Sequence, residues 1–123
     1  MSVEKEKFVK EFKKRLYTFV LKLIDFIDNL PQARVYNRLS NQLLRSGTSV
    51  LSNYVEGQSS YSKKEFTNFL TISLKSANES KVWLALLKDS KRATIQKTAW
   101  FLSELDELSK ILASSVLKCK GKR

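Results

Sequence analysis

Residues 42–88 read QLLRSGTSVLSNYVEGQSSYSKKEFTNFLTISLKSANESKVWLALLK, and this stretch decides the fold of the chain. Apolar residues recur at steps of three and four on both sides of a polar segment, GQSSYS. This spacing is typical of amphipathic helices, because residues three and four apart share one helix face. The stretch therefore predicts two long helices joined by a polar turn.

Signals on both sides mark the turn between these two helices. Gly57 is expected to end the first helix, because glycine readily adopts the backbone conformation that follows a helix C-terminus. Ser62 and Glu65 have the spacing of a capping box at the start of the second helix. Tyr61 and Phe66 occupy the two positions of a hydrophobic staple.

The first helix of this hairpin is predicted over residues 33–56, with an apolar arc too wide for one neighbouring helix to cover. Gly47 lies inside the arc, where glycine costs about 1 kcal/mol relative to alanine, so a close approach between helices is expected there. A polar ladder faces the other way and either meets solvent or forms a hydrogen-bonded seam against another helix or subunit. Its members are Arg38, Gln42, Arg45, Ser49, Asn53 and Glu56.

The second helix of the hairpin is predicted over residues 63–88, and small polar residues share its apolar face. Ser73, Ser76 and Ser80 permit close packing, and their hydroxyls are expected to bond to backbone carbonyls or to the polar ladder. Glu79 lies at the edge of the face and needs a partner if it is covered. Arg45 is the candidate.

Two further amphipathic helices are predicted outside the hairpin. Pro31 ends the one over residues 3–30, because proline has no N–H to donate, and Thr94 is placed to cap the one over residues 95–118. The apolar face of the first consists of Phe8, Phe12, Leu16, Phe19, Leu23, Phe26, Ile27 and Leu30. The apolar face of the last consists of Ile95, Ala99, Leu102, Leu105, Leu108, Leu112, Val116 and Leu117.

These elements predict an all-α domain, an antiparallel up-down-up-down four-helix bundle over residues 1–118. Its helices span about 3–30, 33–56, 63–88 and 95–118, and a basic tail, residues 119–123, is expected to be disordered. Three glycines and one proline in 123 residues agree with few, long elements. Trp100 and Ile111 fall together on the outer side of the last helix, which suggests a contact beyond the monomer.

The formal net charge is +11, from 23 Lys and Arg against 12 Asp and Glu. A charge of this size either attracts a polyanion, nucleic acid above all, or serves solubility. No helix-turn-helix spacing is present, so binding to the phosphate backbone is expected rather than base readout. The candidate residues for nucleic-acid binding are Lys7, Lys10, Lys14, Lys64, Lys75, Lys118, Lys120, Lys122 and Arg123.

The sequence offers little for catalysis. It contains no histidine, which removes the commonest general base and metal ligand, and its one cysteine, Cys119, supports no disulfide or metal cluster. Glu56 and Glu79 are too few for a di-metal bundle site. We therefore expect no enzyme, no metal and no cofactor. The charged start and the lack of an apolar run of about 20 residues predict a cytoplasmic chain without a membrane span.

The hairpin resembles that of the four-helix-bundle proteins that include the 23S rRNA intervening-sequence proteins, once labelled S23 ribosomal proteins, and the accessory protein of diversity-generating retroelements. The resemblance covers most of the chain, including the Pro31 break and the closing segment DELSKILASS. The matching positions are Gln42 to Ser46, Ser49, Asn53, Tyr54, Glu56, Ser62 to Phe66, Glu79, Trp83 and Leu84.

This resemblance implies a bacterial protein that forms a ring-like homo-oligomer, most often a pentamer, with a basic surface. It implies a gene inside an rRNA insertion or beside a reverse transcriptase, and in the second case binding to that transcriptase and to nucleic acid. It also favours a structural seam made of Arg45, Ser49, Asn53, Glu56 and Glu79. The expected function is a non-catalytic oligomeric bundle that binds RNA or DNA by backbone charge. A protein–protein scaffold is the alternative.

Overall fold

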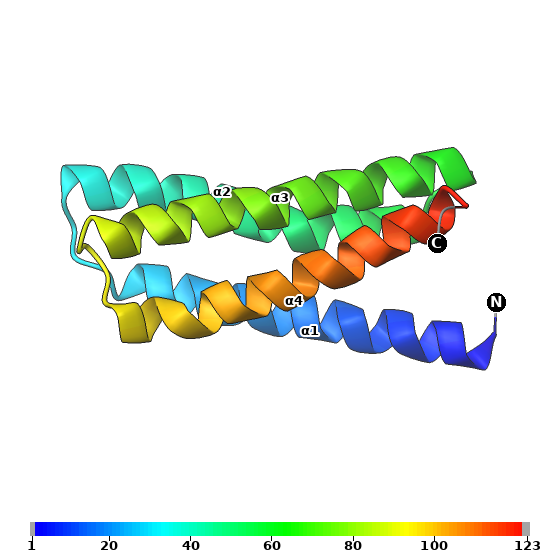
Figure 1. Cartoon of the computed structure of the whole chain (residues 1–123), viewed down its shortest axis with the longest axis horizontal. Coiled ribbons are helices and arrows are strands. Elements are labelled where there is room, and N and C mark those ends of the chain that lie inside the picture. Colours follow the sequence, from blue (N-terminus) through cyan, green and yellow to red (C-terminus); the bar gives the residue numbers. More distant parts are fainter. Residues whose placement is uncertain (1, 122–123) are drawn as a thin grey trace.

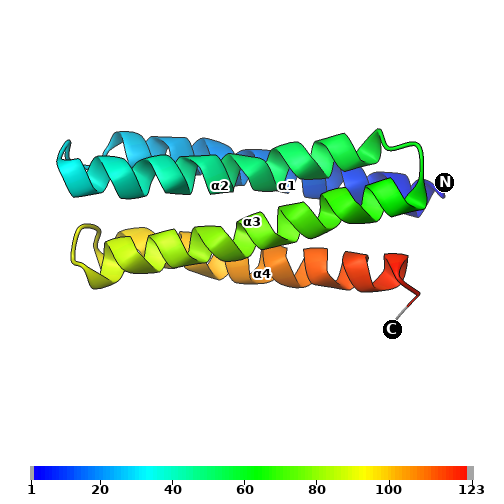
Figure 2. The same ribbon diagram turned by 90° about the horizontal axis from the view of Figure 1, so that it is seen from above.

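Four long helices make up most of residues 2–121, which are the residues that the computed structural model describes. They are α1 (Val3–Asp28), α2 (Arg34–Gln58), α3 (Lys63–Asp89) and α4 (Ile95–Cys119). Each helix runs antiparallel to the one before it, and the four surround a common core in the order α1, α2, α3, α4 (Figures 1 and 2). This arrangement confirms the predicted up-down-up-down bundle.

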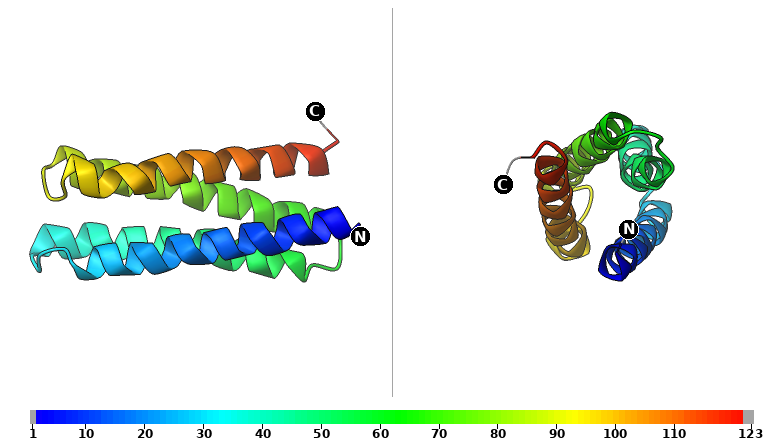
Figure 3. Two further views of the ribbon diagram at one scale, coloured as in Figure 1. Left: turned by 90° about the horizontal axis from the view of Figure 1, so that it is seen from below. Right: turned by 90° about the vertical axis from the view of Figure 1, so that its right-hand side faces the viewer.

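The two ends of the bundle differ. The start of α1, the turn between α2 and α3, and the end of α4 lie together at one end, here called the terminal end (Figure 3). The turns 29–33 and 90–94 lie at the other end. Helices α2 and α3 make the closest contact in the bundle, whereas α1 and α4 make the least and diverge toward the terminal end (Figure 1).

Side-chain caps begin three of the helices. Ser2, Ser62 and Thr94 each accept a hydrogen bond from the backbone N–H three residues ahead, at 3.1 Å in every case. The predicted caps at Ser62 and Thr94 are therefore confirmed. Helix α1 ends at Asp28, two residues before the predicted boundary, because the Asn29 side chain donates to the Asp25 carbonyl.

The end of α2 differs from the prediction. Gly57 does not stop the helix, which continues to Gln58; Gly57 is instead buried against α3, where an added Cβ would lie 3.1 Å from Cβ of Phe69. The predicted hydrophobic staple is also wrong, because Tyr61 is fully exposed. The Glu65 carboxylate closes this corner instead, accepting the Tyr61 backbone N–H at 3.2 Å.

The core is formed mainly by leucine and phenylalanine, and the predicted close approach at Gly47 is confirmed. A Cβ at Gly47 would collide with a terminal methyl of Leu23, so α1 and α2 approach closely at this glycine. The predicted face of α4 is partly wrong, since Ile95 and Leu117 are exposed and the neighbouring Thr98 and Phe101 are buried. Within residues 2–121, none of the helices has the length and apolar character needed to cross a bilayer.

Candidate functional site

Small hydroxyl residues line the contact between α2 and α3. Ser46 and Ser80 are fully buried, and their hydroxyl oxygens lie 2.7 Å apart. Ser73, also fully buried, donates to the Val50 carbonyl of α2 at 2.7 Å. Because each hydroxyl has a partner, two helices can approach closely without leaving a buried polar group unsatisfied.

The predicted polar ladder takes part in the same contact. Ser76 of α3 donates to the Ser49 hydroxyl at 2.8 Å, and Asn53 donates to that hydroxyl at 2.8 Å from within α2. Ser49 and Asn53 are half-buried. Glu56, in contrast, is exposed and its carboxylate forms no hydrogen bond with any described residue, so the structure does not place it with the other members. Sequence reasoning on the ladder missed the pairing of Ser46 with Ser80, although both serines fall on inward helical positions.

Charged groups extend this contact, here called the α2–α3 seam, to the protein surface. Arg45 pairs with the Glu79 carboxylate, the partner that the sequence suggested, and also donates to the Gln42 side chain at 3.0 Å. The Trp83 indole N–H donates to the same Glu79 oxygen at 3.0 Å. Glu79 therefore has partners on both sides, which accounts for a carboxylate at the edge of an apolar face.

The seam has the character of packing rather than of a reactive centre. The serine hydroxyls are engaged with one another or with backbone carbonyls. Among residues 2–121, no three Cys, Asp or Glu side chains are grouped as a metal site would require. The hydrogen bonds of the seam therefore hold two helices together.

Helices α1 and α4 are joined by an ion pair that the sequence did not reveal. Arg15 donates from Nε and Nη2 to both oxygens of Glu104, at 2.7 and 2.8 Å, and from Nη2 to Glu107 at 2.9 Å. The hydrogen bond to Glu104 is the main reason that the pKa of Arg15 is raised above its usual value. Arg15 directly precedes the buried Leu16 and therefore lies at the edge of the apolar face. This position was the signal in the sequence that Arg15 could contact another helix.

Most of the candidate nucleic-acid lysines lie at the terminal end. Five belong to the first turns of α1 and α3 or the last turn of α4 and its cap: Lys7, Lys10, Lys64, Lys118 and Lys120. Lys14 lies farther along α1 and Lys75 near the middle of α3, and all seven are exposed. Lys122 and Arg123 lie outside the described residues. Within residues 2–121, the ion pairs use none of these lysines.

The proposed oligomer contact at Trp100 and Ile111 has neighbours inside the monomer. The Trp100 ring stacks on Phe19 with centroids 6.3 Å apart, and the Lys22 ammonium lies 4.8 Å from its centroid. Trp100 remains 40% exposed, whereas Ile111 is half-buried and packs against the core. Trp100 therefore offers more exposed surface to a second subunit than Ile111 does.

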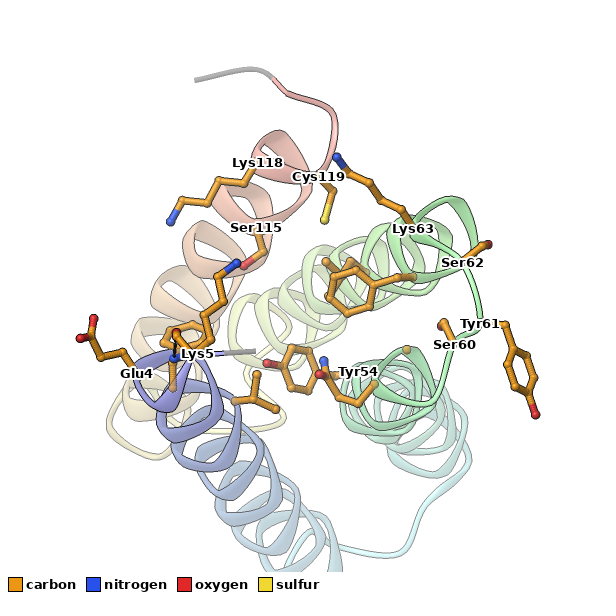
Figure 4. A pocket seen from close by; sticks show the side chains of 17 residues that line it. Glu4, Lys5, Tyr54, Ser60, Tyr61, Ser62, Lys63, Ser115, Lys118 and Cys119 are labelled. Atoms are coloured by element: carbon orange, nitrogen blue, oxygen red, sulfur yellow. Dashed lines mark hydrogen bonds between the residues drawn. The ribbon is translucent and has the colours of Figure 1, made fainter.

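A pocket of about 780 Å³ opens at the terminal end, between the start of α1 and the end of α4 (Figure 4). Its interior is the apolar wall, formed by Phe8, Val9, Phe66 and Leu70 together with the ring of Tyr54. Its mouth carries the rim lysines, Lys5, Lys63 and Lys118. Phe8 was predicted in the core but is 47% exposed, because α1 diverges from α4 here.

Three polar groups lining this end pocket have no hydrogen-bond partner among residues 2–121. Tyr54 is only 3% exposed, and its hydroxyl points into the pocket (Figure 4). The ring packs edge-to-face on Phe12 with centroids 5.0 Å apart, and burial raises the pKa of Tyr54 to about 12. The other two groups are the buried amide nitrogen of Gln58 and the buried hydroxyl of Ser60. No pattern in the sequence indicated this pocket.

The fold is a basic, all-α antiparallel bundle, and the buried serines between α2 and α3 hold these two helices together. The chain belongs to the 23S rRNA-intervening sequence protein family, since the family model matches residues 10–114. This confirms the resemblance drawn from the hairpin residues.

A solved structure supports the same relationship. The chain is similar to a protein of unknown function from the S23 ribosomal protein family of Bacteroides thetaiotaomicron, with 31% sequence identity and a TM-score of 0.78. The match covers 85% of this chain and 97% of the other. No curated protein matches the chain. Neither description names an enzymatic activity.

Proposed function

We propose that this chain is a non-catalytic, homo-oligomeric bundle that binds RNA or DNA through the charge of the nucleic-acid backbone. The observation that carries the proposal is the group of lysines at the terminal end that form no ion pair within residues 2–121. Lysines without carboxylate partners can displace the counterions of a phosphate backbone, which supplies most of the affinity in binding without sequence preference. The family description, which refers to an intervening sequence of 23S rRNA, adds support for RNA.

A salt titration tests this proposal. Binding to a structured RNA and to duplex DNA is measured by fluorescence anisotropy from low to high salt. Several phosphate contacts predict a log–log slope steeper than about −3. No binding to either nucleic acid at low salt would overturn the proposal.

Matched triple variants locate the contact surface. Lys7, Lys64 and Lys118, each changed to Gln, remove three charges from the terminal end. Arg34, Lys97 and Lys110, each changed to Gln, remove three charges elsewhere. The first variant is expected to flatten the slope by about 3, and the second by less than about 1. Equal effects would argue against a terminal-end surface.

Exposed apolar residues on α1 support the oligomer. Tyr17, Leu21 and Ile24 follow one another at helical spacing and are 56%, 52% and 46% exposed. Such a stripe is typical of a surface that another protein covers. A pentamer is favoured by the family resemblance, and light scattering should give a mass well above the 14.2 kDa of one chain. Leu21→Glu should dissociate the oligomer, whereas Thr18→Glu, at an exposed neighbouring position, should not.

A protein–protein scaffold is the second candidate. Ile72, Val82 and Leu86 of α3 are each 45% or more exposed, which favours a further protein partner such as a reverse transcriptase. This function would replace the first if the chain formed an oligomer and bound no nucleic acid at any salt concentration. The single cysteine suits a reducing compartment, and we propose a cytoplasmic location on that ground.

A further inference from the structure

The end pocket has the size and lining of a small-molecule site. Its volume of about 780 Å³ falls within the range of about 300–1,000 Å³ that ligand pockets have. The apolar wall contains two phenylalanine rings, and the ring of Tyr54 adds a third aromatic surface. A flat, aromatic ligand would bury apolar area against these rings and stack on them.

An unpartnered donor narrows the chemistry of that ligand. The Tyr54 hydroxyl points into the pocket and can donate a hydrogen bond, whereas the unpaired Gln58 amide nitrogen and Ser60 hydroxyl belong to lining residues but are covered by protein atoms. A hydrocarbon body would leave the Tyr54 hydroxyl unpaired, so the ligand body that fits has a hydrogen-bond acceptor on its edge.

The positive charges at the mouth of the pocket favour an anionic ligand. The rim lysines extend from three different helices, and Lys5 and Lys63 reach toward α4 across the opening (Figure 4). Glu4 is the one carboxylate among the residues that line the pocket. The N-termini of α1 and α3 lie at the same end and add partial positive charge.

We propose that the end pocket binds a nucleoside monophosphate. The base is planar and aromatic and carries acceptor atoms on its edge, so it fits the apolar wall and the Tyr54 hydroxyl. The phosphate remains at the mouth among the rim lysines. The ligand is either a free mononucleotide or the 5′-phosphorylated end of a strand, and only the second form rests on the function proposed above.

Binding can be measured directly and at a reporter inside the pocket. Cys119 lines the pocket, is half-buried and is the single cysteine of the chain. Adenosine 5′-monophosphate should give a titratable heat in calorimetry and slow the reaction of Cys119 with a thiol reagent. Adenosine, phenyl phosphate and inorganic phosphate should each bind at least about tenfold more weakly, because each lacks one part of the recognised structure. Inorganic phosphate binding as tightly as the nucleotide would overturn the assignment.

Two variants test the residues. Tyr54→Phe keeps the ring and removes the unpartnered hydroxyl, so the fold should persist while affinity for the nucleotide falls about tenfold. Lys118→Ala changes an exposed side chain at the rim and should also weaken binding. Lys110→Ala, on the same helix and outside the pocket, is the control. The proposal fails if the nucleotide neither protects Cys119 nor gives heat at millimolar concentration, or if Tyr54→Phe binds it unchanged.

Short oligonucleotides distinguish a free mononucleotide from the 5′-phosphorylated end of a strand as the ligand. If a 5′-phosphorylated trinucleotide protects Cys119 and its 5′-hydroxyl counterpart does not, the pocket takes a strand end. If the mononucleotide protects and neither trinucleotide competes, it takes a free nucleotide. The salt titration of long RNA in Tyr54→Phe is expected to match wild type, so failure of the pocket and failure of backbone binding are distinguishable.

Discussion

The α2–α3 seam and the α1–α4 contact flank the same core from opposite sides and are built from different residues. In the seam, buried serines pair with one another and with a backbone carbonyl, so the helices pack closely along their length. Between α1 and α4, long side chains such as Arg15 and Glu104 connect helices that diverge toward the terminal end.

The difference shows how side-chain size decides where a bundle can open. A serine hydroxyl can form its hydrogen bonds where two helices pack closely, because the side chain is short. Arginine and glutamate have long side chains, so they connect helices that stay farther apart. The end pocket lies where α1 and α4 separate, and the Tyr54 hydroxyl that points into it has no hydrogen-bond partner among residues 2–121. A packing side and an accessible side therefore coexist in one small domain.

The largest effect is expected from enlarging a serine of the seam. Ser80→Val adds volume where α2 and α3 pack closest and removes the hydrogen bond to Ser46. Overpacking and the lost bond together should lower the free energy of unfolding by about 3 kcal/mol, measured by urea denaturation. Ser115→Val is the matched control, because Ser115 bonds only within α4 and lines the end pocket. A cost as large at Ser115 would contradict the contrast.

Stability at high pH tests the environment of Tyr54 in the end pocket. Burial raises the pKa of Tyr54 from 10.0 to about 12, so the folded state favours the neutral phenol. Its contribution to stability is complete below pH 10 and is lost as the pH rises through 12. Between these values, wild type should lose about 2 kcal/mol relative to Tyr54→Phe in urea unfolding. Parallel pH profiles for the two proteins would show that the hydroxyl is solvated.

The ion pair between α1 and α4 should contribute less. In a double-mutant cycle, Arg15→Met and Glu104→Gln are expected to couple by about 1.5 kcal/mol, because the pair is bidentate and the Glu104 side chain is only 13% exposed. The coupling should weaken in high salt. Independent effects of the two changes would mean that apolar contacts alone hold α1 to α4.

The smallest difference concerns the exposed part of the seam. Arg45→Ala should cost about 1 kcal/mol, since it removes the partner of Glu79 but leaves the bond from Trp83. Lys14→Ala changes an exposed residue without an ion pair in the described chain and should stay within about 0.5 kcal/mol. Equal, small values would show that the seam depends on its serines and not on its charges.

The sequence predicted the features that depend on the residue pattern within one helix. Apolar spacing located all four helices to within about two residues, and the position of Gly47 in the apolar arc correctly indicated the close approach to α1. Glu79 at the edge of an apolar face required a cation, and the hairpin offered Arg45. The pairing of Arg45 with Glu79 could be predicted because the short turn fixes which residues of the hairpin are neighbours.

What the sequence did not predict depends on relations between helices far apart in the chain. Arg15 and Glu104 look like ordinary solvated charges until α1 and α4 are placed side by side. Gly57 resembles a helix stop until Phe69 of α3 shows that it lies at a tight helix contact. The end pocket arises from the divergence of two helices, which no periodicity within either helix records.

The tight seam also has a consequence for how the chain folds. Helices α2 and α3 are joined by only four residues, so little entropy is lost in bringing them together. We expect this hairpin to be structured in the folding transition state, with α1 and α4 docking afterwards. Ser80→Val should then slow refolding, whereas Arg15→Met should mainly speed unfolding, as seen in the two arms of a chevron plot.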